Sequence, residues 1–574
     1  MWSKIISYIP SWSTLFQAGL ALIIPLGIYY INTSIYSFVG SKGAKSKHSS
    51  GRPLSDENNE GHIDQQNKPN SKITGNFDSD LNSIRESIGE NSDVHFREFM
   101  LKKFHARSVL VFIEGMQDEK LMSNQVLEVL MFEGQQGQQD QQEQQEQQEQ
   151  QEQQEQQESI STSFIKDSLM PLTQISEVTS MEELYEFILL GHTALLIEGM
   201  KEALLVGSPN GAIRSVNEPT SEALLRGPRI GFTEVLSENT SMLRRQGLNK
   251  NLEIKKFQVG SRIKKDLVVA YIKDIVNPDL LEEVKRRISK IDMDFLAESG
   301  YVEQLIEDNY LSPFQQVHNT ERPDRVINAL LEGRIAILLD GTPFALIVPV
   351  TFSMLLQSPE DYYERWIPGS LLRLLRFFGA FIALMGPALY ISFISFHPGL
   401  IPTKLVISII QTRQGVPFPS VIEVMILEIS IEILREAGIR LPKPIGPAMG
   451  IVGGLVIGDA AVNAGIVSPF LVIVVAVTAI SSFSIPTYSA GITLRLLRFV
   501  GMLFAALLGM LGTILFFLLI CIHLTKLKSF GVPYVTPFSP MRLSDLKDMY
   551  IRAPISLMKR RPVMMKTQQK RRRP

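Results

Sequence analysis

The chain has 574 residues, a formal net charge of −2 and 45% hydrophobic residues, and its only cysteine is Cys521. A single cysteine excludes an intrachain disulfide scaffold. The average composition conceals three runs without any Lys, Arg, Asp or Glu, each longer than the roughly 20 residues that cross a bilayer. These runs, which predict an integral membrane protein, are Phe377–Thr403, Ala460–Leu494 and Phe499–Thr525.

The N-terminal residues 1–40 contain a further apolar segment, residues 12–39, which carries no charge. One lysine precedes this segment and four basic residues follow it, so the positive-inside rule predicts a signal-anchor helix with its C-terminal end in the cytoplasm. An interfacial hairpin is the alternative, because Pro25 and Gly27 interrupt the segment. Residues 41–93 are rich in Ser, Asn, Lys, Asp and Gly, a composition that predicts a disordered linker.

A soluble α/β region is expected to follow, in two related subdomains that span residues 94–251 and 252–365. In the first, Ser108–Met116 is predicted to be a buried strand and Asp118–Phe132 a helix. Residues 135–158 consist of triplets, most of them Gln-Gln-Glu. A period of three does not keep one face of a helix apolar, so we expect a solvated insertion without chemistry.

An internal repeat relates the two subdomains. Ile188–Val206 aligns with the stretch that ends at Val348 at one constant offset, so that Gly199 matches Gly341. Each copy has the pattern of helix, glycine C-cap, strand, tight turn and strand. Arg226–Arg245, between the copies, is basic, but no glycine-rich phosphate loop precedes a helix there, so we expect a structural or interface role. The second subdomain is further expected to contain strands around Phe257 and Val268 and a helix at Asp279–Ser289.

Residues 366–528 are predicted to form an all-α polytopic membrane domain of about five helices, followed by a basic tail, residues 529–574. The sequence LRLLRF opens two apolar runs, at Leu372–Phe377 and Leu494–Phe499, so both helices should begin at the same membrane face. The side of the tail stays open. Five crossings would leave it outside, whereas an acidic helix at Val421–Arg435 that lies on the surface would give an even number and bring it inside.

The stretch Pro442–Pro469 is apolar and glycine-rich and is predicted to be a helix with two distinct faces. At about 100° per residue, its glycines form a stripe suited to close helix packing, while four other residues gather on the opposite side. An ionisable residue in such a segment faces a bundle interior or a water-filled path rather than lipid, although a packed helix with a hydrogen-bonded aspartate is the alternative. We expect a packing face of Gly446, Gly450, Gly454 and Gly458 and a pore-lining face of Val452, Val456, Asp459 and Asn463.

The acidic helix carries one stripe of three glutamates, Glu428, Glu432 and Glu436. Such a stripe cannot face lipid. One interpretation is a set of intrahelical salt bridges, Glu432 with Arg435 and Glu436 with Arg440, on an interfacial helix. The other interpretation is an acidic vestibule that attracts cations.

Eight long motifs lie between about residues 94 and 562. They are RGPRIGF, ERPDRVINALLEGRIAILLDGTPFALIVP, SPEDYYERW, GSLLRLLRF, SFHPGLIPTKL, GVPFPSVIEVMILEISIEILREAGIRLPKPIG, IVGGLVIGDAAVNAGIVSP and SFGVPYVTPFSP. Together they resemble the A subunit of the spore germination receptors, the GerA family. The N-terminal apolar segment, the Gln-Gln-Glu tract and Asp459 depart from the family pattern.

The resemblance implies a multi-pass protein of the spore inner membrane, with its soluble region on the cytoplasmic side, that works with a transporter-like B subunit and a lipoprotein C subunit. It also implies that A subunits oligomerise, as pentamers, into a ligand-gated ion channel that releases cations to start germination. The sequence contains no catalytic, cofactor-binding or metal-binding motif, so we expect no enzyme activity, no cofactor and no metal. We expect membrane lipids and no nucleic acid as further partners. The alternatives from other classes are a secondary transporter and a membrane-anchored scaffold for a signalling complex.

Overall fold

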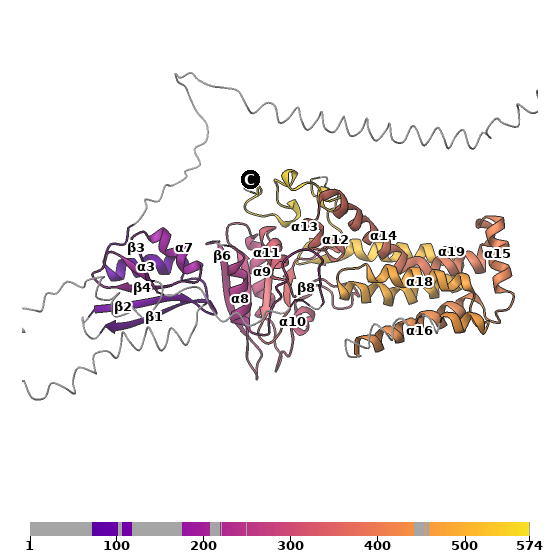
Figure 1. Cartoon of the computed structure of the whole chain (residues 1–574), viewed down its shortest axis with the longest axis horizontal. Helices are drawn as coiled ribbons and strands as arrows, with labels where there is room; N and C mark the ends of the chain where they lie inside the picture. Colours follow the sequence, from indigo (N-terminus) through magenta and orange to yellow (C-terminus); the bar gives the residue numbers. More distant parts are fainter. Residues whose placement is uncertain are drawn as a thin grey trace, which may run out of the picture. The chain divides into compact units, whose positions relative to one another are not determined.

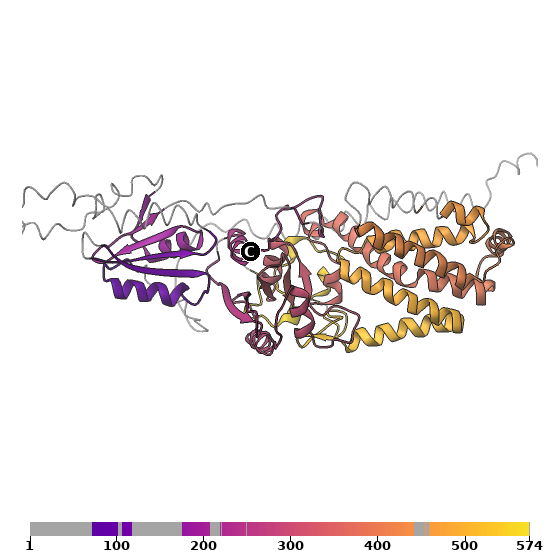
Figure 2. The same cartoon turned by 90° about the horizontal axis from the view of Figure 1, so that it is seen from below.

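The computed structural model describes most of the chain from Lys72 onward, and Figure 1 and Figure 2 show its elements from two directions. Three predicted features lie outside the described residues: the anchor segment 1–40, the helix Asp118–Phe132 and the Gln-Gln-Glu tract 135–158. The described residues are 72–101, 106–116, 175–206, 218–219, 221–247, 249–440, 454, 458–542 and 544–572.

Subdomain 1 is built around a five-stranded antiparallel sheet with the strand order β1-β2-β4-β5-β3. Every residue of β4 and β5 is buried, as expected for short apolar strands rich in leucine and valine. The predicted strand Ser108–Met116 corresponds to β2. The elements are α3 (Phe77–Ile88), β1 (Val94–Leu101), β2 (Ala106–Ile113), β3 (Ile175–Val178), α7 (Met181–Leu189), β4 (Thr193–Ile197) and β5 (Ala203–Val206).

Subdomain 2 repeats this topology, with the strand order β6-β7-β9-β10-β8 and antiparallel pairing throughout. The predicted strands around Phe257 and Val268 are β6 and β7, and the predicted helix is α9. Its N-terminus is capped by the Asn277 side chain, with Pro278 at the first helical position. The elements are α8 (Leu236–Arg245), β6 (Leu252–Val259), β7 (Lys265–Ile272), α9 (Pro278–Ile288), α10 (Ser299–Ile306), β8 (His318–Thr320), α11 (Pro323–Leu331), β9 (Ile335–Leu339) and β10 (Ala345–Val348).

The internal repeat predicted from the sequence is confirmed. One constant shift along the chain carries the bounds of α7, β4 and β5 onto those of α11, β9 and β10, residue for residue. Gly199 and Gly341 occupy equivalent turns with φ values of +86° and +83°. Only glycine adopts such values without a steric penalty, which explains why both copies carry glycine at this point.

The start of subdomain 1 differs from the prediction. We predicted a disordered linker over residues 41–93, but α3 (Phe77–Ile88) lies inside that range, so the prediction is wrong there. Helix α3 buries Phe77, Leu81, Ile84 and Ile88, which recur at helical spacing. Averaging the composition over the whole range hid this apolar stripe. Helix α8 precedes β6 in the same way that α3 precedes β1, so each subdomain opens with a helix and the second begins before the predicted residue 252.

Arg244, on α8, links the two subdomains. Its Nε and Nη2 donate hydrogen bonds of 2.6 and 2.8 Å to the carboxylate of Asp93, and both side chains are buried. Its Nη2 also donates to Asn91 Oδ1, which accepts a second hydrogen bond from the backbone N–H of Ile254. The basic stretch Arg226–Arg245 therefore contributes an interface contact, in line with the structural role that we expected for it.

The C-terminal half is helical. Two of its helical segments, Trp366–Phe396 and Tyr488–Lys526, are long and apolar enough to cross a membrane, and Pro469–Phe483 is a shorter apolar helix. The predicted number of about five membrane helices stays a prediction. The elements are α12 (Phe352–Leu356), α13 (Glu360–Tyr363), α14 (Trp366–Ile391), a π-helical turn (Ser392–Phe396), α15 (Thr403–Arg413), α16 (Ser420–Arg440), α18 (Pro469–Phe483) and α19 (Tyr488–Lys526).

Helix α19 folds back on itself at Gly509, where φ is 58° and ψ is −134°. On either side of this break, the rings of Phe504 and Phe516 lie 5.8 Å apart between centroids. Near its two ends, Thr493 and His523 hydrogen-bond to consecutive residues of subdomain 2. Thirty residues of straight helix would separate these ends by about 45 Å. Helix α19 is therefore a hairpin of two arms that meet subdomain 2 at the same place.

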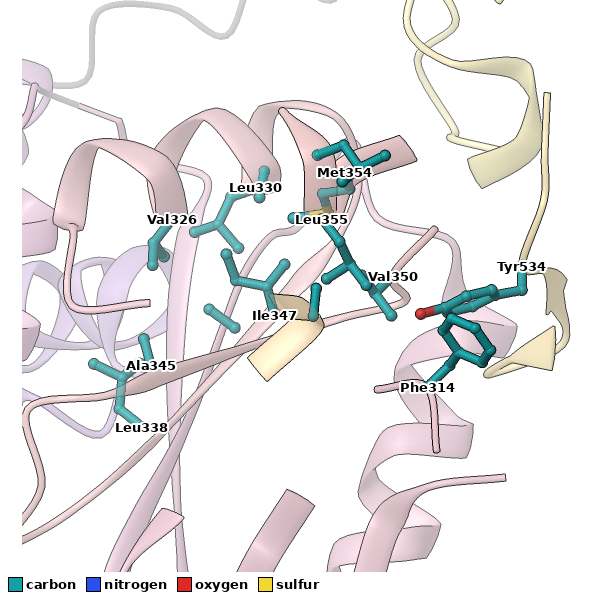
Figure 3. Close-up of a cluster of buried hydrophobic side chains, with 14 of the residues drawn as sticks. Phe314, Val326, Leu330, Leu338, Ala345, Ile347, Val350, Met354, Leu355 and Tyr534 are labelled. Carbon is teal, nitrogen blue, oxygen red and sulfur yellow. The ribbon is translucent and has the colours of Figure 1, made fainter. Parts of the chain in front are cut away.

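The basic tail packs on subdomain 2. Tyr534 is fully buried in a hydrophobic core that subdomain 2 shares with α14 and α19, and Figure 3 shows its ring lying against that of Phe314. Further along, Arg561 Nε donates a 2.8 Å hydrogen bond to Leu331 O, and Gln568 Nε2 donates one of the same length to Val276 O. The tail is therefore a packed part of the body that contains subdomain 2, and the number of membrane crossings stays a prediction.

Candidate functional site

The predicted pore-lining face is described in part. Asp459 and Asn463 lie on helical residues 458–463, and both are exposed. A Cβ atom added to Gly454 would meet nothing within 4 Å, and one added to Gly458 would meet only Val472 Cγ1, at 3.7 Å. Among the described residues of the two faces, Asp459, Asn463 and Gly454 are exposed, whereas Gly458 is half-buried and lies next to α18. The other predicted residues, Val452, Val456, Gly446 and Gly450, lie outside the described residues.

The acidic stripe of α16 is bound by arginines. Glu428 Oε2 lies 2.8 Å from Arg498 Nη2, and both side chains are 1% exposed. Glu432 lies 3.0 Å from Arg435, 3.3 Å from Arg495 and 3.9 Å from Arg498 between the closest charged atoms. Arg495 and Arg498 belong to the second LRLLRF motif. This motif therefore ties the first arm of α19 to α16.

The third predicted glutamate, Glu436, is exposed and lies 2.7 Å from Arg440 on the same helix. Both intrahelical pairs of the salt-bridge alternative are thus present, Glu432 with Arg435 and Glu436 with Arg440. Around Glu428 and Glu432, three arginines face two carboxylates, so this group carries more positive than negative charge. A cation-attracting vestibule at α16 stays a prediction. Each of the three glutamates, Glu428, Glu432 and Glu436, is paired with an arginine.

The first LRLLRF motif forms a second buried charge cluster, which we did not predict. Arg373 Nε lies 3.1 Å from Asp361 Oδ2, and its Nη1 lies 2.8 Å from Asp548 Oδ1. Arg376 Nη1 lies 2.5 Å from the other oxygen of Asp361. Because Asp361 belongs to α13 and Asp548 to the tail, the base of α14 is fixed to two segments that lie outside the apolar run.

The loop between α10 and β8, residues 307–317, is the third part of the site, and we call it the junction loop. Ser529 Oγ donates a 2.6 Å hydrogen bond to Gln316 O, and Tyr534 OH donates one of 2.6 Å to Gln315 O. The Gln315 side chain in turn donates a 3.1 Å hydrogen bond to Glu303 on α10. The junction loop therefore holds the point at which α19 passes into the tail.

Glu303 carries an unusual carboxyl. Burial and, to a smaller extent, the charge of Glu307 raise the pKa of Glu303 to about 7, although the hydrogen bond from Gln315 opposes the rise. Burial also raises the pKa of Glu307 itself. A group of this pKa changes its charge near neutral pH, so we expect the contact between α10 and the junction loop to depend on pH.

Sequence reasoning identified the acidic helix and both LRLLRF motifs but did not pair them. The signal that could have revealed the pairing is the two arginines of each LRLLRF motif, because a charge at the start of an apolar run requires a partner. Asp361, Asp548 and the junction loop carried no local motif that marks them. Their role depends on contacts between segments that are far apart in the chain.

The comparisons with known proteins agree on one family. The family described as "Bacillus/Clostridium GerA spore germination protein" matches residues 82–564. Spore germination protein GerLA of Bacillus cereus is 41% identical over 496 residues, which cover 86% of this chain and 97% of the relative. Spore germination protein B1 of Bacillus subtilis (strain 168) is 42% identical over 491 residues, with coverage of 86% and 97%.

A solved structure is also similar, the crystal structure of the N-terminal domain of the A subunit of the Bacillus megaterium spore germinant receptor GerK3. It is 29% identical, with a TM-score of 0.38, and the match covers 50% of this chain and 99% of that one. The family match spans most of the chain, and the relatives are covered over nearly their whole length. The chain therefore belongs to the GerA family of spore germination proteins.

Proposed function

We propose that the chain is the A subunit of a nutrient germinant receptor and that several copies, as a pentamer, form a ligand-gated path for cations in the spore inner membrane. In this proposal a transporter-like B subunit and a lipoprotein C subunit complete the receptor, and the soluble subdomains lie on the cytoplasmic side. Family membership supports the receptor assignment. The conducting path is argued from the residues below.

The observation that carries the proposal is the exposure of Asp459 and Asn463 on a helical segment of an otherwise apolar run. A carboxylate that faces lipid is costly, so such a residue turns toward protein or water. A Cβ atom added to Gly454 would meet none of the described residues within 4 Å, which leaves room for the close approach of another helix. Association of several copies would cover the glycine face and enclose the polar face around a common axis.

The ion pairs of the two LRLLRF motifs support the same proposal. The pairs of the first motif fix α14 to α13 and the tail. Those of the second motif fix the first arm of α19 to α16, with Glu428 and Arg498 almost completely buried. Removing one partner of such a pair leaves an uncompensated buried charge, so the pairs resist rearrangement. None of these ion pairs involves Asp459 or Asn463, so both side chains remain available to line a path.

Ion flux through the purified chain in liposomes tests the proposal. Val452→Ala or Val456→Ala shortens an apolar ring that blocks ions by dewetting, so either variant should leak ions without nutrient. Asp459→Asn should lower the preference for cations, and Gly454→Leu should prevent assembly. Val477→Ala is the matched control, because Val477 is an exposed valine of α18 whose truncation opens no path.

Each outcome has a clear meaning when ion leakage and protein level are measured in the same variants. Leakage at normal protein level in the Val452 and Val456 variants, with none in the Val477 control, supports a pore. Reduced protein level without leakage would show that the glycine helix is packed core, since valine truncation in a core costs about 0.5 to 2.5 kcal/mol. Nutrient-dependent uptake of a solute in place of ion flux would favour the transporter alternative.

A further inference from the structure

The tip of the junction loop presents two large apolar side chains to the outside. Tyr310 is 80% exposed and Leu311 is 78% exposed. The tip is nevertheless held in a defined turn, because Asn309 Oδ1 accepts a 3.1 Å hydrogen bond from the backbone N–H of Leu311, and Asn309 O accepts one of 3.2 Å from that of Ser312. Two large apolar side chains presented side by side on a hydrogen-bonded turn form a candidate contact surface.

The neighbours of this tip fix its position. Ser312 Oγ lies 2.8 Å from His523 Nε2 on the second arm of α19. The residue before His523 is Ile522, an apolar side chain that is 51% exposed on the arm. Leu311 precedes Ser312 in the chain, and Ile522 precedes His523. Consecutive Cα atoms are only about 3.8 Å apart, so both apolar residues lie close to this hydrogen bond. The exposed tip therefore lies beside the second arm of α19, near its exposed apolar residue Ile522.

The chemistry of the surroundings matches a membrane surface. Tyrosine is enriched where membrane-spanning segments meet the headgroups, since its ring is apolar and its hydroxyl is polar. Lys526 and Lys528 follow His523 closely and are both exposed. Lysines next to the end of a spanning helix attract anionic lipid headgroups.

We propose that Tyr310 and Leu311 insert into the headgroup region of the membrane, next to the second arm of α19, with anionic lipids bound by Lys526 and Lys528. This contact would anchor subdomain 2 to the bilayer through a loop that also holds the tail. The inference rests on the proposed function in one respect, that α19 lies in the membrane.

The test uses the full chain reconstituted in vesicles of phosphatidylcholine and phosphatidylglycerol. In a Cys521→Ser background, Leu311→Cys is labelled with a small fluorophore, and its quenching by headgroup nitroxide lipids is compared with quenching by iodide in water. The matched control is Leu225→Cys in the same background, because Leu225 is 92% exposed in the soluble region. The label at residue 311 should be quenched several-fold more by the nitroxide lipid than the label at residue 225, and less by iodide.

Two results would overturn the inference. Strong iodide quenching at residue 311, equal to that at residue 225, would place the loop in water. Protection from both quenchers would place it against another protein surface, such as a second copy of the chain. A label on the native Cys521 separates the failure of this inference from the failure of the proposed function. It is tested with lipids that carry the nitroxide in the acyl chain. If these lipids do not quench the Cys521 label, α19 is not in the bilayer and the proposed function fails as well.

The lysines provide a second measurement. In vesicles of phosphatidylcholine alone, quenching at residue 311 should weaken, and Lys526→Ala with Lys528→Ala should reproduce this loss in the mixed vesicles. Unchanged quenching in both experiments would contradict the part of the inference that concerns anionic lipid.

Discussion

Arg373 and Asp361 form an ion pair in which neither side chain is exposed, with 3.1 Å between Nε and Oδ2. Removing one partner of a buried pair costs about 3 to 5 kcal/mol when the other charge is left alone. Because Asp548 still faces Arg373, we expect Asp361→Ala to lower the free energy of unfolding by at most this amount and to loosen the packing of α13 on α14. Urea unfolding of the purified protein in detergent measures it.

The matched control for this prediction is Asp78→Ala, which removes the exposed pair of Asp78 with Arg107. Exposed pairs contribute at most about 1 kcal/mol. If the two variants lost the same free energy of unfolding, burial would not make the Arg373 cluster more important for stability than an exposed ion pair.

The repeat predicts a steric requirement at Gly341, where φ is +83°. A β-branched residue at such a position costs about 1 to 3 kcal/mol, so Gly341→Val should impair folding or assembly and, with it, germination. Gly341→Asn should be milder, because asparagine tolerates the left-handed region. Normal assembly of the valine variant, together with loss of a chemical activity, would contradict the role of the repeats as an assembly platform. Protein level and oligomer size measured by native electrophoresis distinguish these results.

The raised pKa of Glu303 predicts a pH-dependent stability. Its pKa of about 7 in the folded chain lies above the ordinary value of 4.5, so the folded state binds the proton more tightly. The contribution is therefore fully present below pH 4.5 and is lost as pH rises through 7. The wild-type unfolding temperature should fall as pH rises from 4.5 through 7. Glu303→Gln should remove most of this fall and leave a smaller one that is due to Glu307. Glu86→Gln, on the exposed side of α3, should keep the wild-type profile, and a profile unchanged by Glu303→Gln would refute the assignment.

The hairpin of α19 depends on Gly509. Its φ and ψ of 58° and −134° lie in a region that is accessible essentially to glycine alone. A Cβ atom there would also approach Phe396 Cγ to 2.7 Å. We expect Gly509→Ala to cost at least about 2 kcal/mol by the strain of this region and to reduce the amount of folded protein in membranes. Gly415→Ala, where a Cβ would meet nothing within 4 Å, should have little effect, and equal yields of the two variants would contradict a strained turn.

The elements that could be predicted are those whose signal is local. Strands β9 and β10 are short apolar runs bounded by Gly333 and Gly341, and the first copy carries the same punctuation, so pattern alone located both hairpins. Helix α3 has an equally local signal in its apolar spacing. It was missed because the surrounding residues are polar and dominated the average composition.

The features that could not be predicted are the point at which the chain reverses and the pairing of residues that are far apart in the sequence. Composition marks Phe499–Thr525 as apolar, but a run of leucine, phenylalanine and glycine does not disclose that the chain reverses at Gly509. The arginines of both LRLLRF motifs are visible in the sequence, whereas the partners Arg373 and Asp548 are 175 residues apart. Only the folded chain brings such residues together.

The packing of the tail sets an order of events during synthesis. Tyr534 fills the core of subdomain 2 and Gln568 bonds to Val276, yet both leave the ribosome after the whole of α14 to α19. The core of subdomain 2 is therefore complete only after the apolar helices have been made. In the membrane arrangement proposed above, those helices are inserted before the tail completes the soluble body. A chain that ends before residue 534 would lack the buried ring that lies against Phe314 and Phe352, so its core would stay unfilled at this point.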